Sequence, residues 1–415
     1  MKIKQKNTID MTHGTLWNKL LIFALPLAAS SILQQLFNSV DTAVVGRFAS
    51  SRALAAVGSN SSLIALMINL FIGISLGSNV IISRYIGQKA EEHVKAAIHT
   101  AIVVALCSGI FVLVLGQFIA RPVLTLMGTP KDVLDLAVLY LRIYFLGMPF
   151  IMLYDFSSSI LRSIGDSRRP LYALIAAGII NTGLNLILVI VFHLGVSGVA
   201  IATVVSNIVS SGILFYILLH EQEPIRVSLS GLSIDWGELK KILIIGVPAG
   251  LQGMVFSLAN VCIQSMINSF GSNAIAGSAA ALNFEFFAYF MVNAFAQTTV
   301  TFTSQNYGAG DFQRCKKVYR LCMIFFRDIL RPVIRCFCTW PGLFPSPVHD
   351  RSECPDFCRT APSDRHHTGT SDLHLRDQRR CHAWLWPFPD TGSDHRGRLL
   401  RAAPHLDQHR LPCRT

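Results

Sequence analysis

Long runs of apolar residues recur along the first 326 positions of the chain, separated by short polar connections. Six runs approach or exceed the roughly 20 residues that cross a bilayer as an α-helix, and a second series of three follows them. Helices are expected rather than strands, because lipid cannot satisfy free backbone polar groups. The pattern predicts an all-α polytopic membrane protein. The runs are Leu16–Val45, Leu54–Ile82, Ala96–Ala120, Val133–Ile160, Leu171–Phe192, Val196–Leu219, Leu239–Phe270, Ala274–Phe302 and Val318–Phe326.

The beginning of the chain recurs, in the same order of residues, after the sixth apolar run. Pro26 in "FALPLAASS" matches Pro248 in "IGVPAGLQG", and Gly87 of "SRYIGQ" matches Gly308 of "SQNYGA". Six helices separate equivalent points, which is an even number, so the two halves have the same orientation in the membrane. Such two-lobed folds place the substrate between the lobes near the midplane and work by rocking the lobes.

The repeat divides the chain into a six-helix lobe at residues 1–222 and an incomplete lobe, helices seven to nine, at 223–326. Residues 327–415 contain 14 Arg, 8 His, 10 Pro and 6 Cys but no Lys, Tyr, Asn or Met. An out-of-frame reading of a GC-rich gene produces this composition, so we interpret the segment as an aberrant, disordered tail, from a frameshift or a sequencing error, in place of three helices. The spacing of its cysteines does not predict a zinc site, because no second well-spaced pair follows.

Composition agrees with a membrane protein, since only 14% of the residues are charged and 52% are hydrophobic. The net charge of +12 does not indicate a nucleic-acid partner, because the charge is unevenly distributed. Before Arg327, 17 Lys and Arg lie in the amino-terminal tail and in alternate connections, against 4 in the other connections. The positive-inside rule then places the amino terminus in the cytoplasm. The basic connections are Arg84–Lys95, Arg162–Arg169, Arg226–Lys241 and Arg314–Arg320.

Charged side chains within membrane helices are costly and usually functional. This chain carries Asp41, Glu285, Arg142 and Asp155 in such positions. Asp41 is the sharpest candidate, because burial disfavours the charged form of a carboxylate and lets it exchange a proton, while its oxygens can equally hold Na⁺. A helix-packing role for Asp41 is the alternative. For Asp155, near the cytoplasmic end of its helix, a structural role is expected.

Three polar residues on two other helices accompany Asp41. Asn181 and Asn185 are four positions apart and therefore lie on one helix face. Thr203 on the next helix could join them with its hydroxyl. Amides and hydroxyls also hold membrane helices together, so a packing role stays open from these residues alone.

The stretches "LPLAASSILQQLFNSVDTAVVG", "ISRYIGQKAEEHVKAA", "LRSIGDSRRP", "LGVSGVAIATVVS" and "TFTSQNYGAGDFQR" closely resemble the multidrug and toxic compound extrusion (MATE) family. The resemblance covers about residues 17–326 and implies twelve helices in two lobes that exchange H⁺ or Na⁺ for amphipathic drugs. In the DinF-like branch, Asp41 falls on the coupling carboxylate, Asn181 on a site Asn and Thr203 on a site Thr. Asn185 stands where that branch has Asp, which leaves one carboxylate instead of two.

Glu285, which recurs in sequences resembling this one, is assigned to the substrate cavity or to coupling. Gln34, Asn38 and the repeat-equivalent Asn260 are assigned to the substrate cavity. The expected function is secondary antiport of drugs or other amphipathic compounds across the bacterial cytoplasmic membrane, impaired by the loss of three helices. No cofactor is expected besides H⁺ or Na⁺, and small molecules and lipid are the expected partners of a monomer.

Two alternatives are a non-functional truncated remnant and a lipid-linked oligosaccharide flippase. A flippase would line its cavity with several basic residues, whereas the apolar helices contain only Arg142. An enzyme is not expected, because the membrane part lacks a phosphate-binding loop and the H-E-x-x-H and G-x-S-x-G motifs. Gly73 and Gly77 are interpreted as a small-residue packing face.

Overall fold

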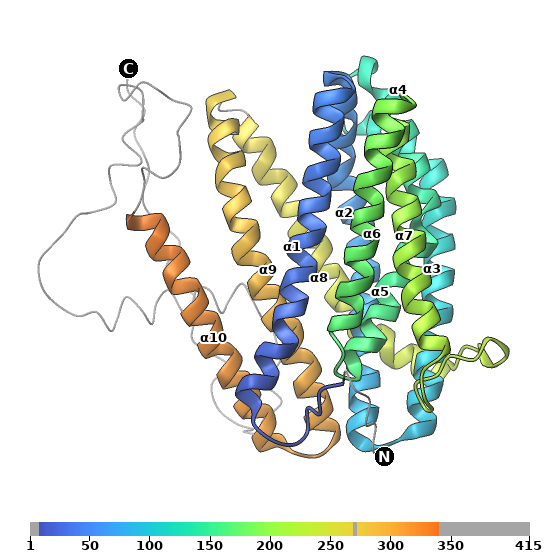
Figure 1. Ribbon diagram of the computed structural model, residues 1–415, viewed down its shortest axis with the longest axis vertical. Helices are drawn as coiled ribbons and strands as arrows, with labels where there is room; N and C mark the ends of the chain where they lie inside the picture. Colours follow the sequence, from blue (N-terminus) through green and yellow to red (C-terminus); the bar gives the residue numbers. More distant parts are fainter. Residues whose placement is uncertain (1–7, 269–271, 340–415) are drawn as a thin grey trace, which may run out of the picture. The chain divides into compact units, whose positions relative to one another are not determined.

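The computed structural model describes residues 8–268 and 272–339, and within these ranges it contains helices and no strand (Figure 1). The predicted all-α fold is therefore confirmed. The helices are α1 (Leu16–Phe48), α2 (Ser51–Gln88), α3 (Glu91–Leu126), α4 (Lys131–Leu146), α5 (Met148–Ser163), α6 (Arg168–Leu186), the π-helix η1 (Ile187–Val191), α7 (Gly195–Leu219), the 3₁₀ turn η2 (Leu229–Gly231), α8 (Trp236–Asn268), α9 (Ser272–Gly308) and α10 (Phe312–Thr339).

Six helices in the described part of the chain are long and apolar enough to cross a membrane: α1, α2, α3, α6 with η1, α7 and α8. The pair α4 and α5 passes the same test together as one bent span. These seven units coincide with the first seven predicted spans, and α9 and α10 occupy the places of the eighth and ninth. The chain is a multi-pass membrane protein.

The fourth predicted span, Val133–Ile160, is not one straight helix. It breaks at Gly147 into α4 and α5, which are bent by 48°. Pro149 lies at the start of α5, where its missing N–H and its ring would disturb a continuous helix. Helix α3 approaches this bend closely at Gly109, where an added Cβ would lie 2.4 Å from the Cα of Pro149.

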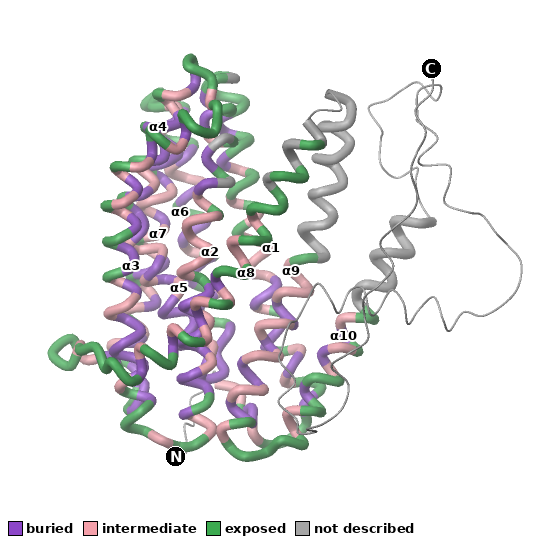
Figure 2. Tube along the Cα trace, turned by 180° about the vertical axis from the view of Figure 1, so that it is seen from behind, coloured by how far each residue is buried: buried purple, intermediate pink, exposed green. Residues whose placement is uncertain are grey.

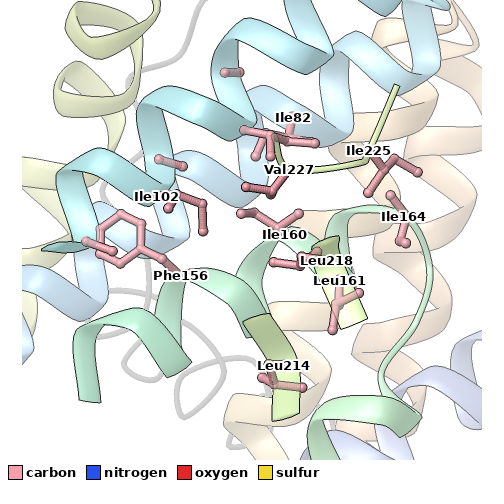
Figure 3. Packing of buried hydrophobic residues seen from close by; sticks show 14 of the residues in the cluster. Ile82, Ile102, Phe156, Ile160, Leu161, Ile164, Leu214, Leu218, Ile225 and Val227 are labelled. Atoms are coloured by element: carbon pink, nitrogen blue, oxygen red, sulfur yellow. The ribbon is translucent and has the colours of Figure 1, made fainter. Parts of the chain in front are cut away.

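The first lobe has two buried apolar clusters, one toward each end of its helices. The cluster in Figure 3 joins α2, α3, α5 and α7 through Ile82, Ile102, Ile160 and Leu218. The other cluster includes Leu141 and lies among α1–α5, η1 and α7. Figure 2 shows buried positions running along these helices. Both clusters make the first lobe a densely packed unit.

The two lobes meet along α2. A Cβ added at Gly73 would lie 2.1 Å from the backbone nitrogen of Gly250, and one at Gly77 would lie 2.4 Å from a carbonyl oxygen of α8. Real Cβ atoms do not approach so closely, so these glycines allow the backbones of α2 and α8 to touch. The expected packing face at Gly73 and Gly77 is confirmed, and its partner is the second lobe.

The first half of α1 also contacts the second lobe. Leu20 and Phe23 of α1 pack with Phe302 of α9 and Phe325 of α10 in a third buried cluster. The rings of Phe23 and Phe302 meet edge to face with centroids 5.5 Å apart. Helix α1 therefore belongs to the first lobe by sequence but joins both lobes by packing.

The connections rich in Lys and Arg gather at one end of the bundle, at the bottom of Figure 1, together with the start of α1. Helix α10 continues to Thr339, past the expected boundary at position 326. The rest of the expected tail, 340–415, lies outside the described residues.

Candidate cation-coupling site

Asp41 is buried near the end of α1, with only 7% of its surface exposed. It is followed one turn later by the buried Val44 and Val45, which face the first lobe. Helix α1 continues unbroken to Asp41 although it contains Pro26. A carboxylate so placed must be neutralised or hydrogen-bonded, because an isolated buried charge is very costly.

The structure brings Asp41 together with all three of its predicted neighbours. The Nδ2 of Asn185 donates a hydrogen bond to Oδ1 of Asp41, and a second one to Oδ1 of Asn181 at 3.1 Å. The hydroxyl of Thr203 lies 3.4 Å from Oδ2 of Asp41. Three helices, α1, α6 and α7, thus converge on one carboxylate.

The two carboxylate oxygens of Asp41 are held unequally. Oδ1 accepts a hydrogen bond from the side-chain amide of Asn185. Thr203 has only one hydroxyl proton, and this proton also reaches the backbone oxygen of Val199 at the shorter distance of 3.0 Å. Oδ2 of Asp41 is therefore the oxygen that is more available to a proton or a cation.

A second oxygen near Asp41 is available as well. Oδ1 of Asn185 is buried and has no hydrogen-bond partner. A buried carbonyl oxygen without a partner costs free energy unless a donor or an ion satisfies it. Carboxylate, amide and hydroxyl oxygens are the ligands that hard cations prefer, and Asp41, Asn185 and Thr203 carry one group of each kind.

One negative charge sets the stoichiometry of this cluster. Asn185 cannot titrate, so Asp41 alone can bind one proton or balance one monovalent cation. Among the described residues, no group of three or more His, Cys, Asp or Glu side chains could hold a metal ion.

Helix α4 adds two tyrosines that the sequence analysis did not single out. Tyr140 and Tyr144 are one turn apart, with ring centroids 6.0 Å from each other, and both lie within electrostatic range of Asp41. The available signal was their i, i+4 spacing, which puts two hydroxyl groups on one face of α4.

The residues assigned to the substrate cavity are not joined by contacts in the described part of the chain. Gln34 and Asn38 are exposed one turn apart on α1, and Asn260 is exposed on α8. Glu285 lies on α9, but its side chain falls outside the described residues. In the part of the chain that the structure describes, no hydrogen bond joins Gln34, Asn38 or Asn260 to Asp41.

The remaining charged residues of the helices have separate surroundings. Arg142 is exposed on α4, and among the described residues no ion pair joins it to a carboxylate. Asp155 is partly buried on α5 within electrostatic range of Arg162. Arg162 donates to Oε1 of Gln297 at 2.8 Å, so it contacts the second lobe.

The chain matches the MatE family over residues 26–187 and 248–337. It is 32% identical over 321 residues to the probable multidrug resistance protein YoeA of Bacillus subtilis (strain 168), covering 76% of this chain and 69% of YoeA. It is 28% identical over 306 residues to the probable multidrug resistance protein YpnP of the same organism, covering 74% and 68%. The FAD transporter of Shewanella oneidensis is 27% identical over 298 residues, covering 70% and 65%.

Solved structures share the fold. A MATE protein crystallised in a bent conformation superposes with a TM-score of 0.75 at 23% identity, covering 80% of this chain and 75% of that one. A transporter of the MOP superfamily from Pyrococcus furiosus gives a TM-score of 0.74 at 22% identity, covering 81% and 75%. The family match and the identity to YoeA show that this chain belongs to the MatE family, whose members are membrane transporters and not enzymes.

Proposed function

We propose that this chain is a secondary antiporter that exports amphipathic compounds across the bacterial cytoplasmic membrane in exchange for H⁺ or Na⁺. The observation that carries the proposal is the convergence of Asn185, Asn181 and Thr203 on the buried Asp41. The names of YoeA and YpnP support drugs as the exported compounds.

Cation binding at Asp41 would act through α1. A buried unpaired carboxylate is costly, and one proton or Na⁺ at Oδ2 removes that cost. Helix α1 also packs Leu20 and Phe23 against the second lobe. A shift of α1 near Asp41 would therefore be transmitted to the contact between the lobes. A cationic substrate would compete with the coupling cation for the negative charge of Asp41. This competition gives exchange rather than cotransport.

The orientation of the chain follows from its charge. The basic connections lie at the end of the bundle where α1 starts. The positive-inside rule supports placing that end, with the amino terminus, in the cytoplasm. Export then moves substrate from the basic end toward the opposite end.

The test is transport by the purified chain in sealed vesicles. Vesicles that hold the protein inside out would be placed in a solution of a fluorescent amphipathic cation, and a pH gradient or a Na⁺ gradient would be imposed separately. We expect one gradient to drive accumulation of the dye without ATP. If neither gradient drives accumulation while inserted protein is demonstrated, the proposed antiport is wrong.

A further inference from the structure

Helices α2 and α9 cross at two glycines that occupy equivalent positions in the repeat. A Cβ added at Gly87 would lie 2.0 Å from the carbonyl oxygen of Gln305, and one added at Gly308 would lie 2.1 Å from that of Arg84. Real Cβ atoms essentially never approach within 3.0 Å of another atom. Each glycine is therefore required by the backbone of the opposite lobe.

Polar contacts between the lobes continue from this crossing into the protein. The hydroxyl of Thr301 on α9 donates to Oδ1 of Asn79 on α2 at 3.0 Å. Nε2 of Gln305 donates to the carbonyl oxygen of Ser163, at the end of α5, at 2.8 Å. All four residues are buried, so the basic end of the bundle is closed between the lobes.

The segment before α1, residues 8–15, crosses the same end of the bundle and is called the amino-terminal strap here (Figure 1). The N–H of Ile9 donates to the carbonyl oxygen of Gly165 in the first lobe at 3.2 Å. The side chain of Met11 is buried and packs in the cluster that contains Phe302 of α9.

The second lobe holds the strap by its backbone. Nδ2 of Asn306 and Nε of Arg314 both donate to the carbonyl oxygen of Met11, at 3.2 and 3.1 Å. Nη2 of Arg314 donates to the carbonyl oxygen of His13 at 2.9 Å. The strap thus ties the loop after α5 to the α9–α10 turn, which belong to different lobes.

We propose that the Gly87–Gly308 crossing is the cytoplasmic gate of the transporter and that the amino-terminal strap is the latch that holds this gate closed. The inference rests on the proposed function for its direction, because a two-lobed transporter must open and close at this end in each cycle. It adds the residues that set the equilibrium between the closed and open states.

The two glycines make the closed state of this gate sensitive to an added methyl group. In the closed state an alanine at position 87 would need α9 to move away by on the order of 1 Å, in an interior that is close-packed. In a state with the lobes apart at this end, the same methyl group meets nothing. Alanine therefore destabilises only the closed state and shifts the population toward the open one.

The experiment measures access to the gate directly. Ser83 lies one turn before Gly87 on the same face of α2. It is fully buried and its hydroxyl has no hydrogen-bond partner, so Ser83→Cys is a mild reporter. The full chain in lipid nanodiscs would be treated with a charged thiol reagent, and mass spectrometry would follow labelling at position 83.

We expect Gly87→Ala and Gly308→Ala to raise the labelling rate by about tenfold or more. The matched control is Gly58→Ala, also on α2, whose added Cβ meets nothing within 4 Å.

Equal labelling rates, within about twofold, in the folded glycine variants and the Gly58→Ala control would overturn the gate. If neither glycine variant inserts, Arg314→Gln decides, because it removes two of the three hydrogen bonds that the second lobe donates to the strap without touching the crossing. We expect it to raise labelling and Lys317→Gln, an exposed position of the same helix, to leave it unchanged. Equal rates in these two variants would overturn the proposal. Nanodiscs expose both faces and need no gradient, so a failure of antiport or an inverted orientation does not alter this readout.

Discussion

Replacing Asp41 with Asn should abolish cation-driven export and leave the protein folded. The variant keeps the size of the side chain and one acceptor oxygen for the amide of Asn185. A hydrogen bond to a charged acceptor is worth about 1.5–3 kcal/mol and a neutral one about 1 kcal/mol, so the loss is about 0.5–2 kcal/mol. The cost of burying a charge is relieved at the same time and is at least as large. We therefore expect the melting temperature of the Asp41→Asn variant to stay equal to that of the parent or to rise.

The loss of transport in the Asp41→Asn variant has a definite expected magnitude. A tenfold cation gradient stores about 1.4 kcal/mol, so one-for-one exchange through a single carboxylate can concentrate a monovalent substrate about tenfold. Without a group that can exchange a charge at this depth, the variant should reach an accumulation ratio of about one under the same gradient.

The assay is dye accumulation in energised vesicles, normalised to inserted protein. Thr42→Val is a suitable control, because Thr42 is the next residue along α1, is exposed, and bonds to the carbonyl oxygen of Asn38 at 2.9 Å. Accumulation by the Asp41→Asn variant equal to that of the control would remove Asp41 from the mechanism. A packing role for Asp41 predicts a third pattern, in which insertion or melting temperature falls while transport per inserted molecule is retained.

Three further predictions concern the site, the fold and the topology. Asn185→Asp should raise the affinity for the coupling cation by about tenfold or more, because it adds a second negative charge beside the first, and equilibrium binding of Na⁺ or H⁺ would measure this. Gly109→Ala should lower the melting temperature in detergent, because its Cβ meets backbone, whereas Gly183→Ala, with open space around it, should not. Cysteines at the exposed positions Lys89 and Met127 should be labelled from opposite sides of the membrane, and labelling from one side would overturn the assignment of the spans.

The helices and the cluster around Asp41 were predictable because their signals are carried by side chains. Apolar runs of sufficient length define the spans whatever their packing. Asn181 and Asn185 had to share a face because of the helical period. The helical period does not predict that this face meets Asp41, because the faces of two separate helices can point in any direction. The resemblance to a known family predicted this contact.

Other features left no such signal. The break at Gly147 depends on how Pro149 is accommodated, and a proline such as Pro26 lies within an unbroken helix. The amino-terminal strap is held through its backbone carbonyl groups, which every residue possesses, so its own side chains do not reveal it. Gly87 and Gly308 stood out as matched positions, but a sequence match between repeats does not indicate that the two copies touch.

The repeat also predicts a symmetry that the packing does not keep. If the two lobes were equivalent, the contact between α2 and α8 would resemble the contact between α9 and α1. Gly246 and Gly250 let α8 touch the backbone of α2, whereas the equivalent positions in the first copy of the repeat are Ala24 and Ala28. A Cβ at each of these positions prevents contact between backbones, and the α1–α9 contact is made instead by side chains such as Phe23. Side-chain contacts can slide and repack, while a backbone contact at glycine tolerates little change in distance. The α2–α8 seam is therefore the stiffer of the two, and we expect the α1–α9 contact, on the helix that carries Asp41, to repack when the α2–α9 crossing opens.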